Sequence, residues 1–193
     1  MPKIQDAKIL IVATDGFEEW ELFGPKQILE QQGATVKLAS LDANPIQATV
    51  HDDSGKAIRP DMTVDEANAS EFDALILPGG VRNPDQLRTH QNVIQLIRAF
   101  ADQGKPIAAI CHGPWLLVEA DLIRGRTVTG WPSIRTDLRN AGARVVDEAA
   151  AVDGNIVTAR KPDDVDAFTN ALIDLLDRQR QSADRQPAEA LQS

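Results

Sequence analysis

Short apolar runs alternate with segments of helical periodicity along most of this chain. Each apolar run is nearly continuous, which is typical of parallel strands buried on both faces. The segments between them place apolar residues three or four positions apart, as amphipathic helices do. The pattern predicts strands at residues 8–13, 35–39, 74–77, 107–110 and 156–159, with short strands near 128 and 145–146. It predicts helices at residues 20–31, 93–101, 115–120, 134–140 and 163–179.

Regular alternation of strand and helix indicates a single α/β domain, a mostly parallel sheet with helices on both faces. Residues 44–65 break the alternation with prolines, a glycine and short β-branched pieces, and they favour a hairpin-like excursion. We therefore predict one domain over residues 1–180. Residues 181–193 are polar and are expected to form a flexible C-terminal tail.

Composition narrows the class of protein. The chain has 193 residues, and 29 acidic against 20 basic side chains leave a formal charge of −9, which argues against nucleic acid as a main partner. A single cysteine, Cys111, cannot form an internal disulfide. The sequence shows neither an N-terminal signal segment nor an apolar run of about 20 residues, so we expect a cytoplasmic protein that does not enter a membrane.

Cys111 carries the clearest chemical signal. The apolar run at 107–110 leads directly into Cys111, and Gly113-Pro114 opens the next helix. This strand–turn–helix order resembles a nucleophile elbow, which presents one side chain above the sheet. Backbone N–H groups at a helix start lower the pKa of a thiol and can bind a developing oxyanion. The alternative is a small buried hydrophobic side chain with no chemical role.

Four segments resemble the DJ/ThiJ/PfpI superfamily, in particular its PfpI branch. They are DGFEEWEL (15–22), FDALILPGG (72–80), GKPIAAICHGPWLL (104–117) and RGRTVTGWPSIRTDLRNAG (124–142). The resemblance spans about residues 8–178. It implies a flavodoxin-like three-layer sandwich of the class I glutamine-amidotransferase-like type, a homo-oligomer of at least two subunits, and a reactive cysteine. Members are described as intracellular cysteine peptidases, as glyoxalases or deglycases, and as redox-responsive stress proteins or chaperones.

The resemblance assigns roles to individual residues. Cys111 is the nucleophile and His112 its neighbour, and Glu21 is the acid that meets the sulfur, protonated so that it donates a hydrogen bond. Glu18 is a second acid of the same pocket. Asp85 is the acid that orients the histidine of an adjacent subunit, although this chain has one more residue before it and Asp where Glu is usual. The alternative for all three acids is a solvated position near a helix start.

Two further positions complete the predicted site. The resemblance makes the backbone N–H of Gly80 an oxyanion donor, and it places Trp131 where another branch of the superfamily has a histidine. Trp131 then lines the pocket or serves only in packing. Because no histidine follows His112, a glutaminase triad is excluded.

We expect neither a cofactor nor a metal. No nucleotide-binding glycine motif follows Gly80, and His51 and His90 lack the spacing of metal ligands. The favoured function is a stress-response cysteine hydrolase of the PfpI protease type, acting on a peptide or a small carbonyl substrate. The alternatives are a glyoxalase or deglycase acting on methylglyoxal or its adducts, and a non-enzymatic redox sensor or chaperone.

Overall fold

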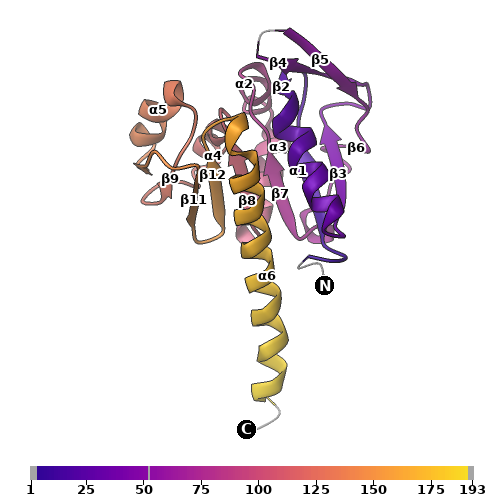
Figure 1. Cartoon of the computed structure of the whole chain (residues 1–193), viewed down its shortest axis with the longest axis vertical. Helices are drawn as coiled ribbons and strands as arrows, with labels where there is room; N and C mark the ends of the chain where they lie inside the picture. Colours follow the sequence, from indigo (N-terminus) through magenta and orange to yellow (C-terminus); the bar gives the residue numbers. More distant parts are fainter. Residues whose placement is uncertain (1–3, 52, 191–193) are drawn as a thin grey trace.

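A seven-stranded sheet forms the centre of the computed structural model, which describes residues 4–51 and 53–190 (Figure 1). The strand order is β11-β12-β8-β7-β1-β3-β6, and every pair is parallel except the edge pair β11–β12. The predicted parallel α/β sheet is therefore confirmed. The strands are β1 (Lys8–Val12), β3 (Thr35–Ser40), β6 (Met62–Thr63), β7 (Ala74–Leu77), β8 (Ile107–Ile110), β11 (Ala150–Asp153) and β12 (Ile156–Ala159).

Both faces of this sheet are covered by helices, and the alternation along β1 shows why. Ile9 and Ile11 pack in one apolar cluster, with Phe168 of the last helix, whereas Leu10 and Val12 pack in the other. These four side chains are fully buried, which explains the continuous apolar run, and only Lys8 at the start of β1 is exposed. The first face carries α1 (Glu19–Gln31) and α6 (Val165–Ala190), and the second carries α2 (Arg82–Leu87), α3 (Gln91–Asp102), α4 (Pro114–Glu119) and α5 (Arg135–Asn140).

Two small sheets stand beside the main one. The predicted excursion at 44–65 contains an antiparallel hairpin, and its first strand also pairs with a two-residue strand that precedes α1. This sheet consists of β2 (Phe17–Glu18), β4 (Ile46–Val50) and β5 (Asp53–Ile58). The second small sheet pairs β9 (Thr127–Val128) with β10 (Arg144–Val145), and single turns of 3-10 helix lie at Ala69–Glu71, Pro132–Ile134 and Pro162–Asp164.

The last helix is longer than the pattern predicts. The predicted end lay at residue 179, but α6 runs to Ala190 and projects away from the body of the molecule (Figure 1). Among the residues of α6 whose side chains are described, Leu176 is the last buried apolar one, and the sequence after it has no apolar period. Residues 181–190 are thus helical where a loose tail was expected, and residues 191–193 lie outside the described residues. The division into a domain at 1–180 and a tail stays a prediction.

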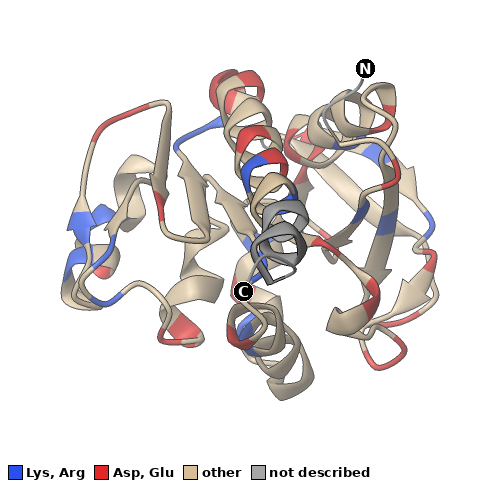
Figure 2. Ribbon diagram, turned by 90° about the horizontal axis from the view of Figure 1, so that it is seen from below, with Lys and Arg blue, Asp and Glu red and all other residues tan. Residues whose placement is uncertain are grey.

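Acidic positions lie mainly on the helices and loops, and basic positions occur on helices, loops and strands (Figure 2). Within residues 4–51 and 53–190, no helix is both long and apolar enough to cross a bilayer.

We predict that Phe168→Ala lowers the free energy of unfolding by about 3–5 kcal/mol, because Phe168 of α6 is fully buried against the sheet. Urea denaturation followed by circular dichroism measures the change. Asn170→Ala is the matched control, because Asn170 is exposed on the same helix. Equal effects of the two substitutions would contradict the assignment of α6 to the core.

Candidate active site

Cys111 occupies a strained turn between β8 and α4. Its φ is +62°, in the left-handed region that side chains rarely adopt. Two hydrogen bonds hold this conformation: the Cys111 N–H donates to the Ala159 carbonyl (3.0 Å), and the Cys111 carbonyl accepts from the Trp131 N–H (2.9 Å). A Cβ at Gly113 would lie 2.4 Å from the Leu77 carbonyl oxygen, so the turn closes only with glycine there. The predicted elbow geometry is present.

A second turn, after β7, brings backbone amides to the sulfur. Gly80 has a φ of +75°, and a Cβ there would lie 2.1 Å from the Gly16 carbonyl oxygen. The N–H groups of Gly80 and His112 both donate toward the Cys111 sulfur, which lowers the pKa of the thiol. The N–H of Gly80 thus faces the sulfur, and its role as an oxyanion donor stays a prediction.

Asn83 holds this second turn in place. Its buried amide Nδ2 donates to the carbonyls of Pro78 (2.9 Å) and Gly79 (3.0 Å), and its Oδ1 accepts from the Thr14 N–H (2.8 Å). The side chain thus fixes the glycine turn to the loop after β1.

Glu21 lies beneath the sulfur and is fully buried. Its Oε2 accepts from the Gly79 N–H at 2.8 Å, and Oε1 has no hydrogen-bond partner within the described residues. The carboxyl group lies beside the Cys111 side chain, with which it interacts electrostatically. Burial raises the pKa of Glu21 to about 8, outweighing the Gly79 and Cys111 contacts that lower it. Glu21 is accordingly protonated at neutral pH, and it is not the solvated acid of the alternative interpretation.

Cys111 and Glu21 titrate as a pair. Burial raises the pKa of the Cys111 thiol, and an ionised Glu21 raises it further because adjacent buried charges repel. The amides of His112 and Gly80 act in the opposite direction. A thiolate is compatible with this site only while Glu21 keeps its proton. The sequence argument considered the helix-start amides and a protonated Glu21, and the structure adds the opposing effect of burial on the thiol.

His112 faces both the sulfur and a serine. Its Nδ1 lies 3.2 Å from Cys111 Sγ, and its Nε2 lies 3.4 Å from Ser133 Oγ. The ring is stacked on Trp131 (centroids 5.9 Å apart) and meets the edge of Trp115 (5.2 Å). Burial lowers the pKa of His112, so the imidazole is neutral at pH 7 and able to accept a proton.

An open cavity of about 870 Å³ lies above Cys111. Glu18 and Trp131 both line it, so Trp131 takes the pocket position as well as packing on His112. Glu18 accepts from the His51 N–H (3.1 Å), and burial raises its pKa.

Asp85 is exposed on α2 and is not among the cavity residues of its own chain, so its contact with the histidine of another subunit stays a prediction. The described residues contain no group of three potential metal ligands.

The whole chain is similar to known proteins. The profile of the DJ-1/PfpI family matches residues 7–175. The chain belongs to the DJ-1/PfpI family. Deglycase PfpI of Pyrococcus furiosus is 38% identical over 169 residues, which cover 88% of this chain and 99% of that protein. YraA of Bacillus subtilis, named as a candidate cysteine protease, is 40% identical over 169 residues, covering 88% of this chain and 98% of YraA.

A solved structure confirms the fold of this family member. DJ-1beta of Drosophila melanogaster superposes with a TM-score of 0.81 at 28% identity, covering 89% of this chain and 91% of that chain. The flavodoxin-like, class I glutamine-amidotransferase-like sandwich that the resemblance implied is therefore confirmed. Relatives carry the names of a protease and of deglycases, so the family points to cysteine-dependent chemistry of one of these kinds.

Sequence reasoning missed three residues of the site: Asn83, Trp115 and Ser133. Trp115 packs on His112 and is held by a hydrogen bond from its Nε1 to Asp137 Oδ2 (2.9 Å). Ser133 lies two residues beyond Trp131, within the segment that carried the resemblance, and Asn83 follows the glycine turn. Their positions near predicted site residues were the only signal, because which side chain faces His112 depends on tertiary contacts.

We predict that wild-type protein loses stability as the pH rises from about 4.5 to about 8, and that Glu21→Gln removes this component. The folded chain keeps the Glu21 proton up to a pKa of about 8, whereas the unfolded chain releases it near 4.5. Raising the pH therefore favours the unfolded state, by up to about 1.4 kcal/mol per pH unit.

Urea unfolding at several pH values gives the slope for each variant. Glu148→Gln is the control, because Glu148 is exposed and should keep the wild-type slope. If Glu21→Gln and wild type show the same slope, Glu21 is ionised in the folded protein and the assignment is wrong.

Proposed function

We propose that this chain is a Cys111-dependent hydrolase of stress defence, acting as a deglycase on methylglyoxal and its adducts with amines. The observation that carries this proposal is the position of the fully buried Glu21 carboxyl group beside Cys111, where both residues line an open cavity. The names of the PfpI-type relatives support the same substrate class. Because Glu21 has a pKa of about 8, it can both donate and accept a proton near neutral pH.

The chemistry needs only groups of this site and water. The Cys111 thiolate attacks the aldehyde carbon of methylglyoxal, and the carbonyl oxygen takes up a proton to give a hemithioacetal. The N–H groups of Gly80 and His112 stabilise the charge on that oxygen during attack. Moving a proton from this carbon to the adjacent ketone carbon, through an enediol, gives the thioester of lactate, and Glu21 is the group placed to transfer it.

Water then cleaves the thioester to lactate and restores the thiol. In total, methylglyoxal and one water give lactate, so the reaction needs no external oxidant or reductant. An amine adduct of methylglyoxal follows the same balance and additionally releases the free amine.

Peptide-bond hydrolysis is the second candidate function. The 3.2 Å contact between Cys111 Sγ and His112 Nδ1 favours it, as does the name of YraA. A peptidase requires His112 to protonate the leaving amine, and this is the role for which Asp85 of an adjacent subunit in a homo-oligomer was predicted. We rank it second because, within the described chain, Nε2 of His112 faces Ser133 and not a carboxylate.

We predict that Cys111→Ser lowers the rate of methylglyoxal conversion by at least about 100-fold, since the serine hydroxyl is a far weaker nucleophile here. Lactate formation by purified protein measures the rate, and urea unfolding verifies that the variant is folded. Peptide hydrolysis lost in Cys111→Ser, without any methylglyoxal conversion by wild type, would favour the peptidase. Neither activity, together with protection of client proteins retained in Cys111→Ser, would favour the chaperone interpretation.

We further predict that the protonated Glu21 lowers the pH midpoint of Cys111 alkylation by iodoacetamide, opposing the rise in thiol pKa that burial causes. Glu21→Leu should raise this midpoint, because leucine cannot donate a hydrogen bond to the thiolate. Glu21→Gln retains a neutral donor and should resemble wild type more closely. With one cysteine in the chain, no other thiol contributes. An unchanged midpoint in Glu21→Leu would refute the proposed role of Glu21.

A further inference from the structure

The backbone of Cys111 is held between two segments that are distant in sequence. Its N–H bonds to Ala159, the last residue of β12, and its carbonyl bonds to Trp131 in the loop before α5. The strained φ of Cys111 therefore depends on how the end of β12 and this loop are placed relative to each other.

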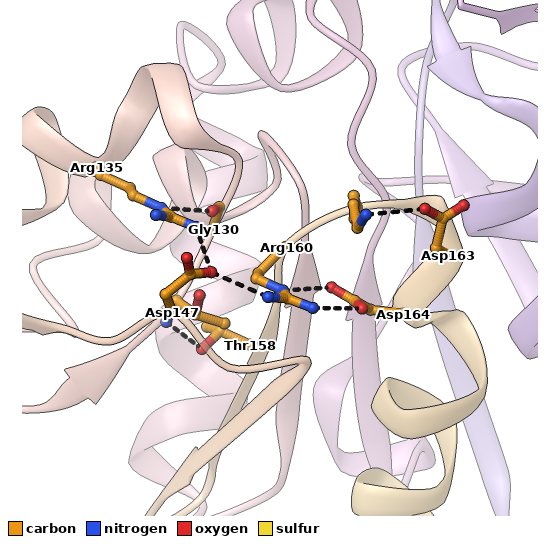
Figure 3. A network of polar contacts seen from close by, with 9 residues as sticks. Gly130, Arg135, Asp147, Thr158, Arg160, Asp163 and Asp164 are labelled. Carbon is orange, nitrogen blue, oxygen red and sulfur yellow. Dashed lines mark hydrogen bonds and ion pairs between the residues drawn. The ribbon is translucent and has the colours of Figure 1, made fainter.

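An ion-pair network joins the same two segments (Figure 3). Arg135, at the start of α5, donates to the Gly130 carbonyl (3.4 Å) and pairs with Asp147 (2.7 Å). Asp147 also pairs with Arg160 (3.0 Å), the residue that follows β12. Asp147 thus connects the loop that bonds to the Cys111 carbonyl with the strand that bonds to the Cys111 N–H.

A buried carboxylate, Asp164, fixes one end of the ion-pair network. Arg160 makes a two-pronged contact with Asp164 (2.8 and 3.0 Å), and the Asp164 side chain is only 6% exposed. A bidentate arginine–carboxylate pair restricts the orientation of both partners. Asp147 itself is largely exposed, so each of its ion pairs contributes little to stability on its own. Its structural effect is to link Arg135 and Arg160, and thereby the two segments that carry them.

The loop held in this way carries Ser133 to His112. For His112 to accept the Cys111 proton at Nδ1, the imidazole must carry its own proton on Nε2. The Ser133 hydroxyl oxygen, 3.4 Å from Nε2, is placed to accept a hydrogen bond from that N–H. When the thiol proton moves to Nδ1, both ring nitrogens carry protons, and the bond from Nε2 to Ser133 is retained.

We propose that Ser133 is a positioning residue that holds His112 in the tautomer with an unprotonated Nδ1 facing Cys111, and that Asp147 fixes the Ser133 loop against β12. The proposal deepens the function proposed above and rests on it. It supplies an orienting partner for His112 from within the same chain, in addition to the adjacent subunit predicted from the resemblance.

The first test replaces Ser133 by alanine and by threonine in the full-length protein. Ser133→Ala should lower kcat for methylglyoxal by about tenfold with little change in KM, because His112 is misoriented while the cavity persists. Ser133→Thr keeps the hydroxyl and should restore most of kcat. Thr136→Ala is the control, since Thr136 lies on the neighbouring helix and bonds to Arg139 instead.

A spectroscopic measurement separates positioning from general damage and does not need turnover. Nitrogen-15 NMR of the histidine side chains distinguishes the two imidazole tautomers. Wild type and Ser133→Thr should show the His112 resonances of the Nε2-protonated form, and Ser133→Ala a mixture. A His112 spectrum unchanged in Ser133→Ala would overturn the proposal, whatever the activity. Absence of turnover in wild type would instead overturn the proposed function and leave this test intact.

The second test concerns the ion pairs that Asp147 makes with Arg135 and Arg160. Asp147→Asn removes the charge that joins Arg135 and Arg160, so the Ser133 loop loosens and the same mixture of His112 tautomers should follow, with a smaller loss of kcat. Asp121→Asn is the matched control, because its exposed carboxylate pairs only with Arg124 among the described contacts and its exposure is similar (67% against 63%). Identical His112 spectra for Asp147→Asn and Asp121→Asn would overturn the role of Asp147.

Discussion

Two acidic groups in contact, both shielded from water, cannot both be ionised, and this constraint governs the site. Cys111 and Glu21 share one negative charge at most, so a reactive thiolate requires a protonated carboxyl beside it. The surrounding structure serves this requirement. Burial of Glu21, in the first turn of α1, raises its pKa, and the glycine turn after β7 supplies the amide N–H that donates to its Oε2.

The parallel sheet explains why these groups meet. The loops after β1, β7, β8 and β12 all emerge at the carboxyl edge of the sheet, where they contribute the segments around Glu21, Gly80, Cys111 and Arg160. Each loop is fastened to a neighbour by a specific contact, such as Asn83 between the first two. Catalytic geometry in this chain therefore depends on contacts between loops more than on any single loop.

Packing against neighbouring side chains determines the protonation state and the orientation of His112. His112 lies between two indole rings, and its burial favours the neutral ring. A neutral imidazole with a defined tautomer accepts a proton from a thiol, whereas a solvated one divides its time between tautomers. Trp115, Trp131 and Ser133 thus matter to the chemistry through the orientation of one ring.

The sequence by itself determined the main strands, most helices, the elbow at Cys111 and the family. These signals are local: continuous apolar runs, the Cys-His-Gly-Pro turn and the glycine pair after β7. It did not reveal the length of α6, because the sequence has no apolar period beyond Leu176, nor the edge strand β11. Only the tertiary structure decided that Glu21 is the fully buried acid among its neighbours, that Nε2 of His112 faces Ser133, and that Asp147 joins α5 to β12. Those facts depend on contacts between segments up to about a hundred residues apart, whose distances no local pattern encodes.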